Sequence, residues 1–236
     1  METILITGAS RGIGLALVEE YLEAGSFYVF ATCRAPETAS ELQTLVSSYP
    51  DHAKLIQLDI SDMASIRASV AAVSAHTNAL DVLINNGAVY PPSEGTRTFG
   101  ALNMDELTDV MQVNAVAPLI VTQSYADLLR TSKNPRVVMV SSEMGSMQWT
   151  KSGGSYAYRM SKAAMNMTAR TLAMDENLAD AIVITTHPGN VITKMSGLTT
   201  GMMPRESASG LVKVIASLTS SDNGKFYQWD GSEHIW

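Results

Sequence analysis

The fold of this chain is decided by the stretch Thr7-Gly8-Ala9-Ser10-Arg11-Gly12-Ile13-Gly14. It follows a short apolar run and leads into a segment with helical spacing that ends at Gly25. A strand, a glycine turn and a helix in this order are typical of a dinucleotide-binding unit. Gly8 permits the tight turn, Gly12 lets backbone amides approach a pyrophosphate, and Gly14 allows the helix to pack on the strand. The helix N-terminus also attracts the anion. A purely structural turn is the alternative interpretation.

Apolar runs rich in β-branched residues recur along the chain, at residues 3–7, 28–32, 55–58, 82–84, 137–140 and 182–186. Stretches with helical spacing separate them, and the pair Ser61-Asp62 provides a capping signal for one of these helices. This alternation predicts a single-domain α/β protein over residues 1–236, a Rossmann-type, doubly wound parallel sheet with helices on both faces. We expect about seven strands, the last near residues 225–229, and a mobile loop at residues 195–204.

Composition excludes several classes of partner. The net charge of −7 and the pI near 5.1 argue against a surface that binds nucleic acid or anionic lipid. No segment resembles a signal peptide or reaches the roughly 18 apolar residues that span a bilayer. Cys33 is the single cysteine, which fits a reducing compartment. We therefore expect a soluble, cytoplasmic protein without a membrane association, and no side-chain cluster has the spacing of metal ligands.

The residues after the second predicted strand indicate which dinucleotide is bound. Proteins that bind NAD commonly place an Asp or Glu there, against the hydroxyls of the adenosine ribose. Here the position holds Cys33 followed by Arg34. Arg34 offers a planar fork of donors to a 2′-phosphate, and Arg11 in the glycine turn could add a second positive charge. The sequence thus favours NADPH over NADH, with solvated surface arginines as the alternative.

The pair Tyr158 and Lys162 is a candidate catalytic centre. The two residues are four positions apart, which places them on the same face of a helix. A phenol can give a proton to a carbonyl oxygen as hydride arrives from a nicotinamide, and a nearby ammonium lowers its ordinary pKa of about 10. The alternative is an exposed helical pair without a chemical role.

These motifs resemble those of the short-chain dehydrogenase/reductase family, whose glycine turn reads T-G-x-x-x-G-x-G and whose active site contains Y-x-x-x-K. Further matches follow in family order: Asn85-Asn86-Gly87-Ala88, Asn114 within N-x-x-x-P, Ser141-Ser142 within S-S-x-x-G, and Pro188-Gly189 within P-G-x-x-x-T. Residues 152–162, Cys33-Arg34 and residues 224–226 look most like the branch that holds C-factor and the Sniffer-like carbonyl reductases.

The resemblance implies a role for each matching residue. Ser142 would bind the substrate carbonyl, Tyr158 would exchange the proton, Lys162 would hold the nicotinamide ribose, and Asn114 would anchor a water in a proton relay. The implied cofactor-binding residues are Gly8, Ser10, Arg11, Gly12, Ile13, Gly14, Arg34, Asp59, Ile60, Asn85, Tyr158, Lys162, Pro188, Gly189, Val191 and Thr193.

Some assignments stay open at this point. Asp59 could instead cap the following helix, Asn114 could be an ordinary interior amide, and Ser146 is a reserve candidate for Ser142. Two departures from the family pattern stand out. Gly87 and Ala88 are exchanged relative to the family order, and the spacing from Ser142 to Tyr158 is longer than usual, which implies an insertion at residues 147–155.

The substrate is predicted from apolar residues that this fold would place around the catalytic face. Flexible thioethers suit an adaptable apolar pocket, so we expect a ketone, an aldehyde or a quinone-like molecule. The candidate pocket residues are Met144, Met147, Trp149 and Met195. Ordinary packing of these side chains is the alternative.

The resemblance also implies a homodimer or homotetramer formed through the helices that carry Asn114 and Tyr158. A rival interpretation of the whole chain is a dinucleotide-binding signalling or redox-sensing protein with little turnover. Against it stands the complete set of Asn114, Ser142, Tyr158 and Lys162. Dehydration or epimerisation of a nucleotide sugar usually needs a longer chain.

Overall fold

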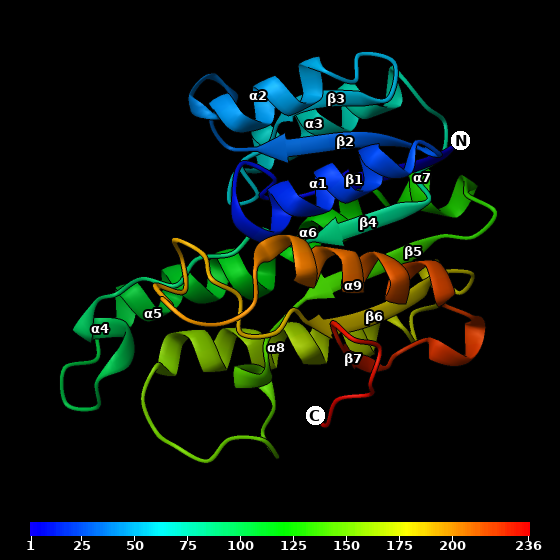
Figure 1. The fold of residues 1–236 in the computed structure, drawn as a ribbon. Helices are drawn as coiled ribbons and strands as arrows, with labels where there is room; N and C mark the ends of the chain where they lie inside the picture. Colours follow the sequence, from blue (N-terminus) through cyan, green and yellow to red (C-terminus); the bar gives the residue numbers. More distant parts are fainter.

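Seven parallel strands form one sheet in a computed structural model that describes all 236 residues (Figure 1). The strand order is β3-β2-β1-β4-β5-β6-β7, so the chain winds outward from β1 to β3 and then crosses back past β1 to β4. The strands are β1 Glu2–Ile6, β2 Phe27–Cys33, β3 Ala53–Gln57, β4 Val82–Asn85, β5 Arg136–Val140, β6 Ile182–His187 and β7 Phe226–Gln228. In sheets of this topology, ligands bind at the carboxyl ends of the strands near the reversal.

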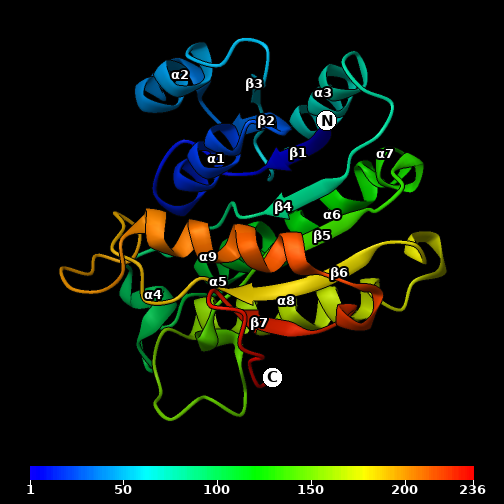
Figure 2. The same cartoon turned by 45° about the vertical axis from the view of Figure 1, so that its right-hand side comes forward.

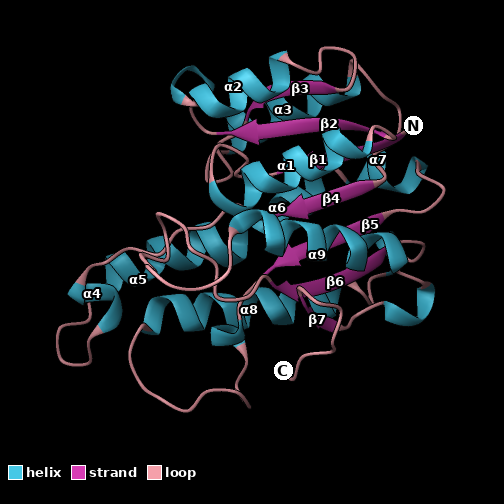
Figure 3. Ribbon diagram, viewed as in Figure 1, coloured by secondary structure: helices cyan, strands magenta, loops and turns pink.

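Helices cover both faces of the sheet (Figure 2). One face carries α1 Gly12–Ala24, α2 Ser40–Ser47 and α9 Pro204–Ser217. The other carries α3 Met63–Ser74, α6 Ala117–Ser124, α7 Ala126–Thr131 and α8 Tyr156–Leu172. Two short helices, α4 Glu94–Arg97 and α5 Met104–Met111, lie at the carboxyl-end side of the strands, beyond their arrowheads (Figure 3). The remaining turns are η1 Pro36–Thr38, η2 Gln112–Val116, η3 Glu143–Gly145, η4 Glu176–Leu178 and η5 Ser220–Asp222.

The strands are stabilised by burial on both faces. In β1, Ile4 and Ile6 belong to the apolar core beneath α1 and α9, whereas Leu5 belongs to the core beneath α3 and α8. This alternation follows from the two-residue period of a strand. Burying a side chain of this kind stabilises the fold by roughly 1.5–3 kcal/mol, which explains why the strands read as continuous apolar runs.

The fold confirms the predicted architecture. Each of the six apolar runs forms a strand, and the expected seventh strand is β7. α1 ends at Gly25, and Asp62 caps α3 by accepting hydrogen bonds from the amides of Ala64 and Ser65. Residues 195–203 contain no helix or strand, although Met202 makes an isolated bridge with Val191. None of the helices combines the length and apolar character needed to cross a membrane.

Candidate cofactor and active site

A cleft of about 310 Å³ opens at the carboxyl ends of the central strands, where the sheet topology predicts a ligand. Residues from the glycine turn, the ends of β2, β3, β4 and β5, α8 and the segment after β6 line it. Of the predicted cofactor residues, it is lined by Gly8, Ser10, Arg11, Gly12, Ile13, Gly14, Arg34, Asp59, Ile60, Tyr158, Lys162, Pro188 and Thr193. Segments distant in sequence therefore meet in one cavity.

The glycine turn packs too closely for side chains at the start of α1. A Cβ atom on Gly14 would lie 2.3 Å from the carbonyl oxygen of Gly8 and 2.6 Å from the Asn86 side-chain nitrogen. The first turn of α1 has no acidic residue, and its N-cap, Arg11, makes no side-chain capping bond. The positive end of the helix thus faces the cleft without an internal anion to neutralise it.

Thr7 and Asn86 fasten the glycine turn to the segment after β4. The Thr7 hydroxyl accepts hydrogen bonds from the amides of Asn86 at 3.0 Å and Gly87 at 2.9 Å. In return, the Asn86 side chain donates to the carbonyl oxygens of Thr7 at 3.0 Å and Gly8 at 3.2 Å. Hydrogen bonds therefore join two motifs that lie about 80 residues apart in sequence, and both motifs line the cleft.

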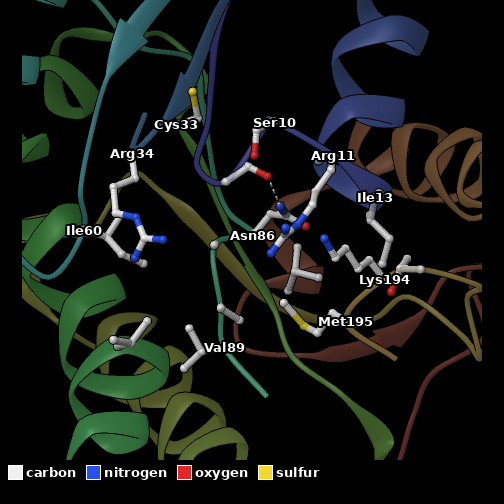
Figure 4. A pocket seen from close by; sticks show the side chains of 18 of the residues that line it. Ser10, Arg11, Ile13, Cys33, Arg34, Ile60, Asn86, Val89, Lys194 and Met195 are labelled. Atoms are coloured by element: carbon white, nitrogen blue, oxygen red, sulfur yellow. Dashed lines mark hydrogen bonds between the residues drawn. The ribbon is translucent and has the colours of Figure 1, made fainter. Parts of the chain in front are cut away.

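Besides Lys162, three basic side chains line the cleft. Figure 4 shows Arg34 beside Ile60 on one side and Lys194 beside Met195 on the other, with Arg11 between them. The residue before Arg34 is Cys33, so the end of β2 presents no carboxylate that would repel a phosphate. The geometry provides one cation at the end of β2 and two more near the start of α1.

Asp59 lines the cleft and does not cap α3. Its Oδ1 accepts hydrogen bonds from the amide and the hydroxyl of Ser61, at 3.0 and 2.6 Å, while the capping bonds come from Asp62. These contacts fix the Asp59 carboxylate beside Ile60 at the rim of the cavity. The alternative of a helix cap at Asp59 is therefore wrong.

Lys162 and Tyr158 approach the cleft from successive turns of α8. Lys162 is 1% exposed, and its Nζ donates a hydrogen bond of 2.8 Å to the carbonyl oxygen of Val140 and lies 5.7 Å from the centre of the Tyr158 ring. Burial lowers the pKa of Lys162 from 10.5 to about 7. Only one of its three donors is used by the backbone, which leaves donors for a ligand in the cleft.

The Tyr158 phenol is protonated at neutral pH in this state. Burial raises the pKa of Tyr158 to about 12, and a hydrogen bond with the Ser142 side chain opposes this shift. Ser142 also caps η3 by accepting from the amide of Met144 at 3.2 Å. η3 packs tightly on α8 because Gly145 has no side chain: a Cβ there would lie 2.7 Å from the carbonyl carbon of Lys162. This packing brings Ser142, Tyr158 and Lys162 together.

The reserve candidate Ser146 lies apart from this trio. Its hydroxyl accepts a hydrogen bond from the amide of Trp149 at 3.0 Å, within its own loop. The side chain is buried and therefore serves the loop conformation. The hydroxyl that meets Tyr158 is that of Ser142.

Asn114 sits in a π-helical turn, η2, which lies between α5 and α6. Its amide nitrogen donates to the carbonyl oxygen of Val89 at 2.9 Å and the Ser161 hydroxyl at 3.0 Å, and its oxygen accepts from the Val89 amide at 2.8 Å. The side chain thus ties η2, the segment after β4 and α8 together. Insertions of this kind are frequent at functional sites.

The structure corrects the placement of Asn85. As the last residue of β4 it is 1% exposed, and its side chain donates a hydrogen bond of 3.1 Å to the Thr122 hydroxyl of α6. Asn86, the next residue, lines the cleft instead. Neighbouring residues point to opposite sides of an extended chain, so the Asn85 side chain faces the core while that of Asn86 faces the cleft.

Two residues of the segment after β6 also lie outside the cleft lining. A Cβ on Gly189 would meet the Trp229 ring at 3.0 Å, and Val191 is buried. Pro188 and Thr193 of the same motif do line the cleft. The segment therefore meets the cavity at its two ends.

Of the four predicted substrate residues, only Met195 lines the cleft. Met147 points into solvent, and the Trp149 ring packs edge-on against His234 at 5.6 Å. The reason is a contact with the C-terminus: the amide of Gln148 donates to the carbonyl oxygen of Trp236 at 3.0 Å. Met144 is half-buried and outside the cleft lining, so three of the four predicted side chains lie outside this cavity.

Some residues that line the cleft were not predicted from the sequence as site residues. They include Asn86, Val89, Val113, Ser141 and Lys194. A signal existed for Lys194, which is the first Lys or Arg after Arg170 and follows the P-G-x-x-x-T motif directly. For Val89 and Val113, apolar residues beside apolar strands and helices, the sequence offered no distinguishing signal.

Comparisons with known proteins identify the family of this chain. A family model described as short chain dehydrogenase matches residues 2–203. A carbonyl reductase from chicken fatty liver, crystallised with NADPH bound, is 32% identical, with a TM-score of 0.93 over 100% of this chain and 99% of that chain. The carbonyl reductase Sniffer of D. melanogaster is 30% identical, with a TM-score of 0.93 and complete coverage of both chains. C-signal from Myxococcus xanthus is 35% identical over 165 residues, which cover 70% of this chain and 98% of that protein.

Proposed function

This chain belongs to the short-chain dehydrogenase family of oxidoreductases, and we propose that it reduces an apolar ketone, aldehyde or quinone-like carbonyl to an alcohol with NADPH. The observation that carries the proposal is that Tyr158 and Lys162 line the cleft together and that the Ser142 side chain forms a hydrogen bond with Tyr158. A protein that only bound a dinucleotide would not need a buried lysine beside a half-buried phenol.

NADPH fits the cleft. The uncompensated N-terminus of α1 and the cation Lys194 suit a pyrophosphate, while Arg34 suits the 2′-phosphate. The chicken carbonyl reductase, which is similar over its whole length, was crystallised with NADPH. When bound, the cofactor would supply the hydride.

In the proposed mechanism, the Ser142 hydroxyl donates a hydrogen bond to the carbonyl oxygen of the substrate. Tyr158 Oη gives its proton to that oxygen as the carbonyl carbon is reduced. The resulting phenolate is stabilised by Ser142 and by the Lys162 ammonium, whose charge lowers the pKa of the neighbouring phenol. We propose that a proton then returns through Lys162, along a relay near Asn114.

Apolar side chains support the choice of substrate. Val89 and Met195 line the cleft. Further large apolar side chains are exposed between α4 and α5, on α5 and on the segment before α9: Phe99, Met104, Leu198 and Met203. Exposed apolar residues in such numbers are typical of a binding surface.

The proposal is tested by following oxidation of NADPH and NADH in parallel with a panel of apolar ketones, aldehydes and quinones. We expect turnover with NADPH and poor discrimination among carbonyls that differ by a methyl group. Strict preference for a small charged substrate would contradict the apolar pocket. Tight binding of NADPH without turnover on any carbonyl would favour the signalling or redox-sensing alternative.

The cofactor preference is tested by a matched pair of variants. Arg34→Gln is expected to weaken NADPH binding by about 10–100-fold and to leave NADH binding unchanged, because only NADPH carries the 2′-phosphate. Lys194→Gln is expected to weaken both cofactors to a similar degree. Fluorescence titration of each variant with each cofactor measures the four dissociation constants. Equal losses for both cofactors in Arg34→Gln would place Arg34 away from the 2′-phosphate.

We also propose a homo-oligomer formed through α8 and its neighbour η2. On α8, Met160 and Met167 are 49% and 64% exposed, and Val116 of η2 is exposed as well. Light scattering on the purified protein should give at least twice the mass of 25.3 kDa. Met167→Glu should lower that mass because it places a charge in the apolar contact.

A further inference from the structure

Tyr90 packs directly on the ring of Tyr158. The two ring centres are 4.6 Å apart and the ring planes are inclined by 57°. Tyr90 follows β4 by a few residues and lies outside the family motifs of the sequence. Its ring therefore limits the positions that the Tyr158 phenol can take.

The Tyr90 side chain is itself held from two further directions. Its hydroxyl shares a hydrogen bond of 2.8 Å with the Ser155 hydroxyl, and the guanidinium of Arg97 lies 4.3 Å from the centre of its ring. Arg97 is fixed in turn, since its Nε donates to the carbonyl oxygen of Pro91 at 3.1 Å. The Arg97 guanidinium on the Tyr90 ring and the Tyr158 ring beside it are favourable contacts that fix the orientation of Tyr90.

Ser155 connects this arrangement to the start of α8. It is the single non-glycine residue with a positive φ, at 50°, and it occupies the N-cap of α8 without making a side-chain capping bond. Its amide donates to the carbonyl oxygen of Arg97 at 3.0 Å, and its hydroxyl is engaged by Tyr90. Backbone strain of this kind persists where surrounding contacts enforce it, often at functional sites.

We propose that Tyr90 is a positioning residue, which holds the Tyr158 ring in the orientation that proton transfer to the substrate requires. The inference rests on the proposed function. The Tyr90 ring contacts Tyr158 and orients it, and Ser155 and Arg97 hold the Tyr90 ring in place. A small misplacement of a catalytic group lowers turnover steeply, because the reacting atoms must be aligned when the proton moves.

The first test compares Tyr90→Leu with Tyr90→Phe. Tyr90→Leu is expected to lower kcat about tenfold or more, because the leucine cannot replace the flat aromatic contact. Tyr90→Phe keeps the ring and is expected to restore most of kcat. The dissociation constant of NADPH should be unchanged in both variants, since Tyr90 is not among the residues that line the cleft.

Ser155→Gly provides a second variant, which tolerates the positive φ and removes the hydroxyl that anchors Tyr90. It is expected to lower kcat by less than Tyr90→Leu does, again with unchanged NADPH binding. This variant keeps the test decisive if Tyr90→Leu does not fold. Equal kcat values in wild type, Tyr90→Leu and Ser155→Gly would overturn the proposal, and so would equal losses in Tyr90→Leu and Tyr90→Phe.

A readout without turnover separates this inference from the proposed function. In protein labelled with fluorotyrosine, the ¹⁹F resonance of Tyr158 is identified by its absence from Tyr158→Phe. We expect this resonance to shift and broaden in Tyr90→Leu. In Tyr90→Phe, which keeps the ring that packs on Tyr158, the resonance should stay near its wild-type position at a matched pH. An unchanged Tyr158 resonance in Tyr90→Leu would overturn the positioning role. A wild-type protein that reduced no carbonyl would overturn the proposed function alone.

Discussion

Tyr158→Phe is expected to lower kcat for carbonyl reduction by about 10²–10⁴-fold, the usual contribution of a positioned general acid. The substitution removes one oxygen atom, which is the atom that gives up the proton in the proposed mechanism. The ring that packs against Tyr90 remains, so the fold and the cleft should be unchanged. The dissociation constant of NADPH is expected to stay close to that of the wild type.

Tyr156→Phe is the matched control for this experiment. Tyr156 lies on the same helix, but its ring packs near Phe99 at 6.2 Å and it is not among the residues that line the cleft. Steady-state oxidation of NADPH, followed by its absorbance, gives kcat and KM for both variants. A Tyr158→Phe protein with wild-type kcat would remove Tyr158 from the chemistry, and equal losses in both variants would indicate a general effect of the substitutions.

Much of the fold was predictable because its signals are local. A parallel sheet buried on both faces needs continuous apolar strands, and each of the six apolar runs forms one. Gly14 was also predictable, since a helix that packs on a strand at this distance has no room for a side chain there. The position of Arg34 followed from the end of β2, because the carboxyl ends of parallel strands meet at one edge of the sheet.

The residues that lie elsewhere than the sequence predicted are placed by contacts between segments that are distant in the chain. Asn85 and Asn86 have the same side chain. Which of them faces Thr122 depends on the residue at which β4 ends, and that residue is Asn85. Trp149 was predicted to contact the substrate. In the structure its ring packs against His234, and the adjacent Gln148 bonds Trp236, contacts that no residue near Trp149 in the sequence indicates. The loop conformation depends on where the C-terminal residues lie, and that is a property of the folded chain.

Tyr90 illustrates the same limit for the chemistry. A tyrosine shortly after β4 carries no motif, and its importance depends on a ring that lies 68 positions later in the chain. Ser155 likewise gives no signal of its positive φ, which residues such as glycine adopt more readily. The catalytic pair was predictable from its four-residue spacing, while the groups that position it were not.

Lys162→Met is expected to abolish turnover and, at the same time, to stabilise the protein at neutral pH. The buried ammonium has a pKa of about 7 instead of 10.5, and this difference costs the folded state about 4 kcal/mol at pH 7. The hydrogen bond to the Val140 carbonyl oxygen offsets roughly 1–3 kcal/mol of that cost. The net gain of about 1–3 kcal/mol should raise Tm by several degrees.

The stability difference should depend on pH in a defined window. Between pH 7 and 10.5, the unfolded wild type keeps the Lys162 proton that the folded protein has lost, so wild-type stability rises with pH relative to the variant by up to about 1.4 kcal/mol per unit. The difference between the two proteins should therefore shrink as pH increases, and it should level off below pH 7, where both states hold the proton. Urea denaturation at a series of pH values measures it.

Lys162→Arg separates the charge from the side-chain volume. An arginine stays protonated across this range, so the variant should be less stable than wild type at every pH above 7. A difference between wild type and Lys162→Met that did not change with pH would mean that water reaches the ammonium. Lys162 thus lowers the stability of the folded protein, and we expect it to be retained because its proton, beside Tyr158, takes part in catalysis.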